Sequence, residues 1–327
     1  MEALINTESA ILPPGGEVLS LPLGHICLRA AYWLPPSGQS SLGTVALFNG
    51  RTEFIEKYCE VIQELLDRGY AVATLDWRGQ GLSSRSQENR LKGHVDDFAD
   101  YDEDIDTFIK DVLLPNCPAP YFLLAHSMGG NIALRYLSRP GNVFDKAVLV
   151  APMTGVHTKP IPMWAAKLVA WTGHAIGRGG SFVPGGDGID PLDELFEKNA
   201  VTSDVARFDR YKSLLHAQPE IATGAPTLGW LRQAFRTMKE VSARDLLGKI
   251  SCPVLIVSAG EDTIADSTTH PATAAAIPMG EMVTVPGAKH EIMMETDDLR
   301  QIFWRAFDEF LSADGQQQSI SPKESAG

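Results

Sequence analysis

Short apolar runs alternate along this chain with longer stretches in which apolar residues recur every three or four positions. The apolar runs lie at residues 26–33, 44–50, 71–76, 121–125, 147–152, 253–260 and 282–285. Helical spacing occupies residues 55–66, residues 102–113, the stretch after Ser127 and the stretch from about residue 297. Strands that are apolar along their whole length are typical of parallel sheets with helices on both faces. The pattern therefore predicts an α/β fold.

The alternation stops after residue 153 and resumes at residue 251. This interruption is far longer than an ordinary connection between a strand and a helix, and it contains helical patterns of its own. It also holds three tryptophans: Trp164, Trp171 and Trp230. The last residues are polar and lack the apolar content of a folded segment. We predict an α/β core of residues 1–153 and 251–312, an inserted helical lid of residues 154–250, and a disordered tail of residues 313–327.

Composition narrows the function classes. Hydrophobic residues make up 44% of the 327 positions and charged residues 21%, as in ordinary globular proteins. The net charge of −13 disfavours nucleic acid, whose phosphates are bound by clustered Lys and Arg. The first residues lack a signal-peptide pattern, and no apolar run approaches the roughly 20 residues of a membrane helix. We expect a cytoplasmic protein, with peripheral contact to the inner face of the membrane as an option.

The chain has four scattered cysteines and neither a CxxC nor an HExxH pattern. Scattered cysteines in strand-like contexts predict reduced structural thiols rather than disulfides. Without a spacing that suits metal ligands, we expect neither a metal nor another cofactor. Nothing in the sequence indicates the oligomeric state.

Ser127 lies where a buried strand pattern, YFLLA at residues 121–125, changes abruptly into a helical pattern. The segment A-H-S-M-G matches the nucleophile-elbow pattern G-x-S-x-G at Ser127 and Gly129, with Ala125 in place of the first glycine. Small residues are needed two positions from the serine because the turn is tight. The alternative is a serine that caps the following helix. The local pattern leaves both interpretations open.

The later part of the chain holds an acid and a base in the order that a serine nucleophile on this kind of fold requires. Functional groups gather at the carboxyl ends of parallel strands, so the acid should follow the strand at 253–260. Three carboxylates qualify by position: Glu261, Asp262 and Asp266. Of the eight histidines, His270 and His290 follow this point, and His270 lies too soon after the strand. His290 is therefore the candidate base.

Six segments, taken in order and spacing, resemble the lysophospholipase and monoacylglycerol lipase group of the α/β-hydrolases. They are NGRTEFIEKY (49–58), DWRGQGLSSR (76–85), GHVDDFADY (93–101), AHSMGGNIALRYL (125–137), SAGEDTIAD (258–266) and GAKHEIMME (287–295). The resemblance covers about residues 15–312, and the first and last segments look most like bacterial lysophospholipases. It implies the α/β-hydrolase fold, with a mostly parallel central sheet, flanking helices and an inserted helical lid.

The resemblance also implies roles for single residues. It assigns the nucleophile, the acid and the base to Ser127, Asp262 and His290. Acyl transfer further needs donors for the oxyanion, and these are expected to be the backbone N–H groups of Met128 and Arg51. Many relatives carry His-Gly-x where this chain has Asn49, Gly50 and Arg51, so the hydrogen bonding of this loop is open. The Arg51 side chain is either a phosphate contact or an ordinary surface arginine.

The resulting hypothesis is a serine ester hydrolase of lipid metabolism that releases a fatty acid from a single-chain lipid. A lysophospholipid is the leading substrate candidate. Monoacylglycerol lipase and general carboxylesterase activities are the alternatives, and peptidase, thioesterase and carbon–carbon hydrolase activities use the same triad. A non-catalytic ligand-binding protein on this fold is disfavoured because all three groups are present in order. Trp164, Leu168 and Trp171 share one helical face of the lid. They either pack within the lid, or line an acyl tunnel, or contact a membrane transiently.

Overall fold

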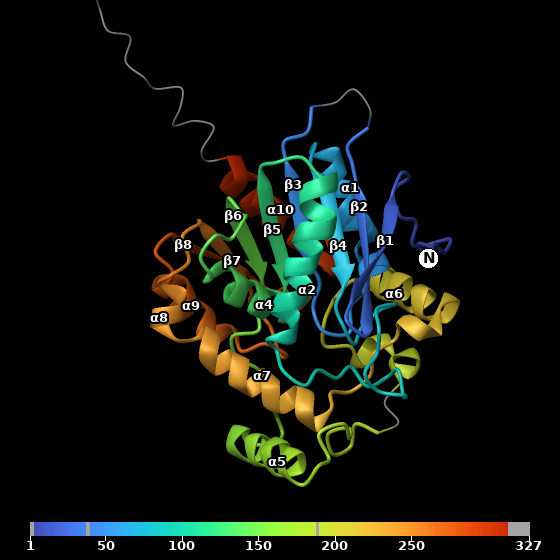
Figure 1. The fold of residues 1–327 in the computed structure, drawn as a ribbon, viewed down its shortest axis with the longest axis vertical. Coiled ribbons are helices and arrows are strands. Elements are labelled where there is room, and N and C mark those ends of the chain that lie inside the picture. The colour runs from blue at the N-terminus through green and yellow to red at the C-terminus, as the bar shows by residue number, and fades with distance from the viewer. Residues whose placement is uncertain (1–2, 37–39, 188–189, 313–327) are drawn as a thin grey trace, which may run out of the picture.

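The computed structural model describes residues 3–36, 40–187 and 190–312, so the predicted tail at 313–327 lies outside the described residues. Within these residues, one eight-stranded sheet has the order β1-β2-β4-β3-β5-β6-β7-β8 (Figure 1). The strands are β1 (Glu17–Leu23), β2 (Ile26–Trp33), β3 (Thr44–Phe48), β4 (Ala71–Asp76), β5 (Tyr121–His126), β6 (Lys146–Val150), β7 (Val254–Ala259) and β8 (Gly280–Val285).

The sheet is parallel from β4 through β3, β5, β6 and β7 to β8, and antiparallel where β1 meets β2 and β2 meets β4. The predicted α/β-hydrolase fold with a mostly parallel sheet is therefore confirmed. Strands β3, β4, β6 and β7 are buried at every residue, which explains their continuous apolar runs. Strand β1 was not predicted, because it lies at the edge of the sheet and only Leu21 of its residues is buried.

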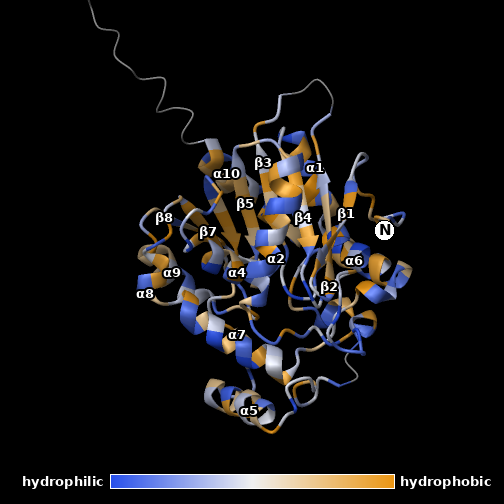
Figure 2. Ribbon diagram, in the orientation of Figure 1, coloured by the Kyte–Doolittle hydropathy of each residue, from blue (hydrophilic) through white to orange (hydrophobic). Residues whose placement is uncertain are grey.

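Helices cover both faces of the sheet, whose strands are mostly hydrophobic in Figure 2. One core lies between the sheet and a group that includes α2 (Asp100–Phe108), α4 (Met128–Leu137) and α9 (His270–Ala276). The other core lies between the sheet and both α1 (Cys59–Asp67) and α10 (Asp297–Ser312). A π-helical turn, Ile109–Leu113, extends α2, and the short α3 (Leu114–Asn116) follows it. None of the described helices has both the length and the hydropathy to cross a bilayer.

The chain between β6 and β7 forms a separate group of helices, which we call the β6–β7 insertion. Its described α-helices are α5 (Met163–Ala175), α6 (Val205–Ala217), α7 (Leu228–Val241) and α8 (Arg244–Leu247), and three short 3-10 helices, Pro191–Asp193, Phe196–Lys198 and Pro219–Ile221, lie between α5 and α7. Helix α7 packs on α4, where the Thr237 hydroxyl donates a hydrogen bond of 2.8 Å to Asn131 Oδ1. Helix α5 packs on α7 and lies outermost in Figure 1. The insertion therefore stands over the end of the sheet from which α4 begins.

Candidate active site

Ser127 occupies the sharp turn between β5 and α4. Its backbone has φ 50° and ψ −112°, a region that costs a non-glycine residue about 1–3 kcal/mol. Hydrogen bonds hold the turn, because Ser127 N–H donates to Val150 O at 3.0 Å and Met153 N–H donates to Ser127 O at 2.9 Å. A Cβ added to Gly129 would lie 2.5 Å from Phe48 O, so this position needs a glycine. The elbow geometry thus accounts for the small residue that the sequence pattern requires.

The Ser127 side chain points to His290 and not to its own helix. Ser127 stands at the N-cap position of α4, but its hydroxyl makes no capping hydrogen bond there. Its Oγ lies 2.9 Å from His290 Nε2, and His290 Nδ1 lies 2.7 Å from Asp262 Oδ2. A carboxylate accepts hydrogen bonds, so Nδ1 carries the proton and the Nε2 lone pair faces the Ser127 hydroxyl. The helix-cap interpretation of Ser127 was therefore wrong.

Asp262 is held in place by the loop that follows β7. Its Oδ1 accepts hydrogen bonds from the N–H groups of Ile264 at 2.8 Å and Ala265 at 2.9 Å, which leaves Oδ2 for His290. Burial raises the pKa of the Asp262 carboxyl. The hydrogen bond and the charge of His290, together with the two N–H donors, outweigh burial, so the pKa of Asp262 is lowered. The carboxylate stays ionised beside its histidine.

The other candidates from the sequence lie elsewhere. Glu261 is exposed to solvent, and Asp266 caps the short helical turn at Ser267–Thr269. His270 begins α9, where its Nδ1 lies 2.8 Å from Ser258 Oγ and its Nε2 lies 3.0 Å from Pro152 O. The structure thus brings together Ser127, Asp262 and His290.

Two backbone N–H groups near Ser127 have no acceptor. Among the described residues, neither the Met128 N–H nor the Arg51 N–H donates a hydrogen bond. The N–H groups on either side of Arg51, those of Gly50 and Thr52, both donate to side chains. Gly50 lies against Ser127, since a Cβ added to it would be 3.2 Å from Ser127 Cβ. The two N–H groups that the sequence analysis selected are thus available to a ligand.

Asn49 anchors this loop to strand β4 and to the residue that follows it. Its side-chain Nδ2 donates to Leu75 O at 2.8 Å, and its backbone carbonyl accepts from Trp77 Nε1 at 2.9 Å. The residue is completely buried. The neighbouring strand β4 and the residue after it therefore supply these two hydrogen bonds, while the buried Asn49 Oδ1 has no partner among the described residues.

His126, the residue before Ser127, forms a buried ion pair with Glu53. His126 Nδ1 lies 3.0 Å from Glu53 Oε2, and its Nε2 lies 3.2 Å from the His290 carbonyl oxygen. Both partners are acceptors, so both ring nitrogens donate and His126 is an imidazolium. Burial lowers the pKa of His126, but the charge of the Glu53 carboxylate outweighs burial, so the pKa of His126 is raised. Burial raises the pKa of Glu53, but the charges of His126 and Lys57 outweigh it and hold the pKa of Glu53 well below its ordinary value.

The same carboxylate collects further donors. The Tyr58 hydroxyl donates to Glu53 Oε2 at 2.6 Å, and Lys57 Nζ donates to Glu53 Oε1 at 3.1 Å and also to Glu291. We call the set Glu53, Lys57, Tyr58, His126 and Glu291 the Glu53 network. It joins the Gly50 loop, the turn at Ser127 and the loop that carries His290. No pattern in the sequence predicted this network, because its members come from three separate segments of the chain.

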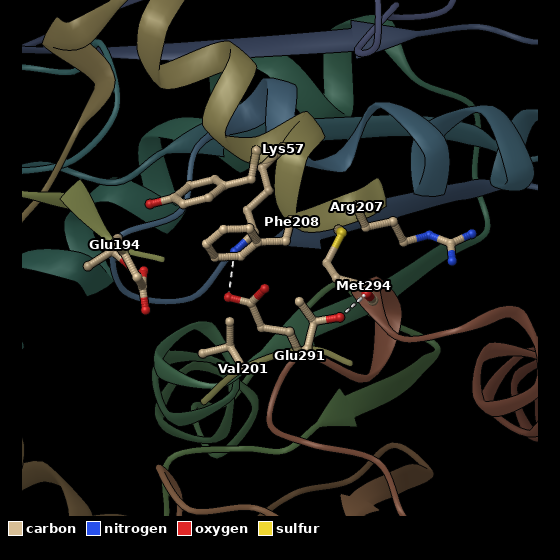
Figure 3. A pocket seen from close by; sticks show the side chains of 10 residues that line it. Lys57, Glu194, Val201, Arg207, Phe208, Glu291 and Met294 are labelled. Carbon is tan, nitrogen blue, oxygen red and sulfur yellow. Dashed lines mark hydrogen bonds and ion pairs between the residues drawn. The ribbon is translucent and has the colours of Figure 1, made fainter. Parts of the chain in front are cut away.

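A small cavity of about 70 Å³ lies next to this network (Figure 3). Lys57 and Glu291 point toward each other across it, and residues of the β6–β7 insertion close its other side. Ligand pockets usually measure about 300–1,000 Å³, so this cavity is too small for an acyl chain. Within the described residues, no three His, Cys, Asp or Glu side chains converge as metal ligands would.

A Ser–His–Asp arrangement at the elbow of a mostly parallel sheet defines the chain as an α/β-hydrolase. Residues 39–297 match the model of the family described as serine aminopeptidase, S33. The chain belongs to this family and is a serine hydrolase, which confirms the resemblance found in the sequence.

Curated relatives and solved structures agree with this assignment. Lysophospholipase L2 from Escherichia coli (strain K12) is 31% identical over 284 residues, which span 82% of this chain and 80% of that protein. The probable lysophospholipase L2 of Haemophilus influenzae is 30% identical over 267 residues, 81% of this chain and 82% of that protein. A soluble variant of monoglyceride lipase from Saccharomyces cerevisiae has the same fold, with a TM-score of 0.73 at 20% identity over 92% of this chain and 96% of that one.

Proposed function

We propose that this chain hydrolyses the carboxylic ester of a single-chain lipid, a lysophospholipid in the first place, through an acyl-enzyme on Ser127. The observation that carries the proposal is His290 between Ser127 Oγ at 2.9 Å and Asp262 Oδ2 at 2.7 Å. Two relatives with identities of 30% and 31% over about four fifths of the chain are named lysophospholipases, which supports this substrate class. No cofactor is needed for the reaction that these residues can perform.

The first half of the reaction forms the acyl-enzyme. His290 Nε2 takes the proton from Ser127 as Oγ attacks the ester carbonyl carbon. The developing oxyanion accepts hydrogen bonds from the free N–H groups of Met128 and Arg51. Collapse of the tetrahedral intermediate breaks the ester bond, and His290 gives its proton to the departing alcohol, a glycerophosphodiester. In the second half, His290 takes a proton from a water molecule as the water attacks the acyl carbon, and returns it to Ser127 Oγ as the acyl–enzyme bond breaks and the fatty acid leaves.

The remaining residues position this machinery. Asp262 holds His290 in the tautomer that leaves Nε2 free, and it stabilises the imidazolium that forms during each half-reaction. His126 donates a hydrogen bond of 3.2 Å to the His290 carbonyl oxygen, and this bond positions the loop that carries His290 relative to Ser127. His126 is therefore a positioning residue, not a second base.

We also propose that residues 154–250 act as a lid on a core of residues 1–153 and 251–312. Ser127 is only 8% exposed beneath the β6–β7 insertion, so a lipid chain needs the insertion to move aside. The outer helix α5 exposes Trp164 by 70%, Trp171 by 60% and Leu168 by 52%. Tryptophans on one exposed face of a helix suit the headgroup region of a bilayer, and we propose transient contact with a membrane there. All four cysteines are free, which supports a cytoplasmic location.

Monoacylglycerol lipase activity is the second candidate. The solved yeast monoglyceride lipase shares the fold, and a monoglyceride lipase from the same organism is 25% identical over 81% of this chain. The same triad would cleave either ester, so the two candidates differ in how the head group is recognised. The aminopeptidase named in the family description is disfavoured, because relatives at 30% identity or more carry lysophospholipase names.

The test is fatty acid release from a lysophosphatidylcholine and a monoacylglycerol with the same acyl chain, with Ser127→Ala as the blank. We expect turnover of both lipids, with the larger kcat/KM for the lysophospholipid, and none in Ser127→Ala. A larger kcat/KM for the glycerol ester would favour the second candidate. Silence on both, with Ser127 still labelled by a fluorophosphonate, would refute the lipid substrate and leave the triad intact.

A further inference from the structure

Three arginines of the core reach the same segment of the β6–β7 insertion, residues 219–224. Arg51 Nη2 donates to Gly224 O at 2.7 Å, and Arg90 Nε donates to Glu220 O at 3.1 Å. Arg85 donates to Ala222 O at 3.2 Å and to the Thr223 hydroxyl at 2.9 Å. Every one of these acceptors is neutral. Among the described residues, none of the three arginines forms an ion pair; the Asp76 carboxylate attracts Arg85, but Asp76 is already paired with Arg29.

A shortage of acidic residues does not explain why these three arginines have no ion-pair partner. The chain has 41 Asp and Glu against 28 Lys and Arg. The two fully buried arginines of the described residues are paired, Arg29 with Glu56 and Asp76 and Arg300 with Glu60 and Glu64, whereas Arg51, Arg85 and Arg90 are half-buried. A buried charge normally needs such a partner, because it loses its hydration on folding. The unpaired cations beside the insertion are therefore an exception that requires a physical reason.

Arg51 is the member of this group that is joined directly to the loop beside Ser127. It follows Gly50, which packs against Ser127, and its own N–H is one of the two free donors described above. Its guanidinium lies over the Trp230 ring, 4.9 Å from the centroid, and its Nε is buried without any acceptor. Burial lowers the pKa of the Arg51 guanidinium to about 10, and burial with repulsion from Arg90 lowers the pKa of Arg85 to about 9. Both groups are cations at neutral pH, in a site that favours an incoming anion.

We propose that the Arg51 guanidinium, backed by the charge of Arg85, is an anion subsite that binds the phosphate of a lysophospholipid while the ester lies at Ser127. The proposal rests on the proposed function, and it names the group that would distinguish a lysophospholipid from a monoacylglycerol. One residue would then contact both ends of the polar part of the substrate, the carbonyl through its N–H and the phosphate through its side chain. A planar guanidinium binds phosphate with two parallel hydrogen bonds. The Gly224 carbonyl holds Nη2 in the closed structure, and the phosphate replaces it when the insertion moves.

The test compares the ratio of kcat/KM for lysophosphatidylcholine to kcat/KM for monoacylglycerol, at one acyl chain length, in three variants. A charge-assisted hydrogen bond lost in Arg51→Gln should lower this ratio roughly 10- to 100-fold. Arg51→Lys keeps the charge without the planar pair of donors and should lower the ratio less. Arg90→Gln is the matched control, because it removes an arginine that also donates to the 219–224 segment, and it should leave the ratio unchanged. An equal loss on both lipids in Arg51→Gln would overturn the proposal and make Arg51 a purely structural residue.

A second measurement separates this proposal from the proposed function. Glycerophosphocholine, glycerol and inorganic phosphate are tested as inhibitors of the hydrolysis of a short neutral nitrophenyl ester. We expect competitive inhibition by glycerophosphocholine, none by glycerol at the same concentration, and an inhibition constant roughly 10-fold weaker in Arg51→Gln. Equal inhibition by glycerophosphocholine in the wild type and in Arg51→Gln would overturn the subsite even if the lipids are hydrolysed. Inhibition by inorganic phosphate alone would also overturn it, because the site would then bind a free anion and not a head group.

Discussion

Glu53 stands at the centre of the buried network, and Glu53→Gln removes its charge while keeping its size. The carboxylate accepts hydrogen bonds from His126, Lys57, Tyr58 and the Gly50 N–H. Three of these donors meet Oε2, and Lys57 alone meets Oε1. A glutamine therefore fits best with its carbonyl oxygen at the Oε2 position and its NH₂ group against Lys57. Even in this arrangement, two cations lose their shared counter-charge and one donor faces another donor.

The magnitude follows from these contacts. A hydrogen bond to a charged group contributes about 1.5–3 kcal/mol, and two such bonds are weakened or lost. Lys57 keeps Glu291 as a partner, so we expect the free energy of unfolding to fall by about 3–5 kcal/mol, the range for breaking a buried pair. As a control, Asp308→Asn makes the same chemical change at the solvent-exposed ion pair with Arg68. There we expect a loss of less than about 1 kcal/mol.

The assay is urea denaturation followed by circular dichroism, at a series of pH values. Glu53 has a lowered pKa, so its contribution is present above its unfolded pKa of about 4.3 and is lost as the pH falls through the folded value. His126 has a raised pKa, so its contribution is complete below its unfolded pKa of about 6.5 and is lost as the pH rises through the folded value. The difference between wild type and Glu53→Gln should therefore be largest between about pH 5 and 6.5.

Two results would refute this reasoning. One is a loss in Glu53→Gln no larger than the loss in Asp308→Asn, which would mean that the buried carboxylate is not paired as described. The other is a difference from wild type that stays constant from about pH 5 to pH 9, because His126 would then not be held as an imidazolium by Glu53. A matching fall in kcat/KM is expected as well, since Glu53 holds the Gly50 loop beside Ser127.

Three further changes test the site and the insertion. In Asp262→Asn, the N–H groups that bind Oδ1 keep the amide oxygen, so the new NH₂ group faces His290 and the histidine proton moves to Nε2. We expect kcat for fatty acid release to fall about 10⁴-fold with little change in melting temperature. A loss in kcat below about tenfold would contradict this. Gly129→Ala places a methyl group 2.5 Å from Phe48 O, so thermal denaturation should show clear destabilisation, and an unchanged melting temperature would show that the elbow can move. Replacing both Trp164 and Trp171 by alanine should weaken binding to anionic vesicles about tenfold in co-sedimentation, whereas equal binding would exclude α5 as the contact surface.

The fold could be predicted from the sequence because burial produces both patterns that were used, the continuous apolar runs of the strands and the helical spacing of apolar residues. Strands such as β3 and β7 are buried on both faces and must be apolar throughout, while α1 buries one stripe and shows helical spacing. Strand β1 has one buried residue, so neither signal marks it. The triad candidates followed from the order of elements, because the ends of parallel strands meet at one edge of the sheet. Asp262 was separated from its neighbour Glu261 only by the resemblance to a family.

The surroundings of the triad could not be predicted in this way. Glu53 meets His126 across 73 positions of sequence, and the Arg51 side chain meets Gly224 across 173. Such contacts depend on where loops and the insertion settle, and no local period records them. The sequence offered two possible roles for Arg51, and the structure shows it partly buried under the insertion instead of free at the surface. The charges near Ser127 thus become interpretable only when their partners are known.

Arg51 differs from the Glu53 network in a way that bears on recognition. Within the network every charge has an opposite charge, so it stabilises one arrangement of the loops and has no need of a ligand. Arg51 has only a carbonyl and an aromatic ring, and Arg85 and Arg90 already hold the 219–224 segment through carbonyls. A neutral amide could satisfy Gly224 O without the cost of desolvating a cation. A cation at this place is therefore useful only to a partner that brings a negative charge, and a phosphodiester next to the ester bond is such a partner.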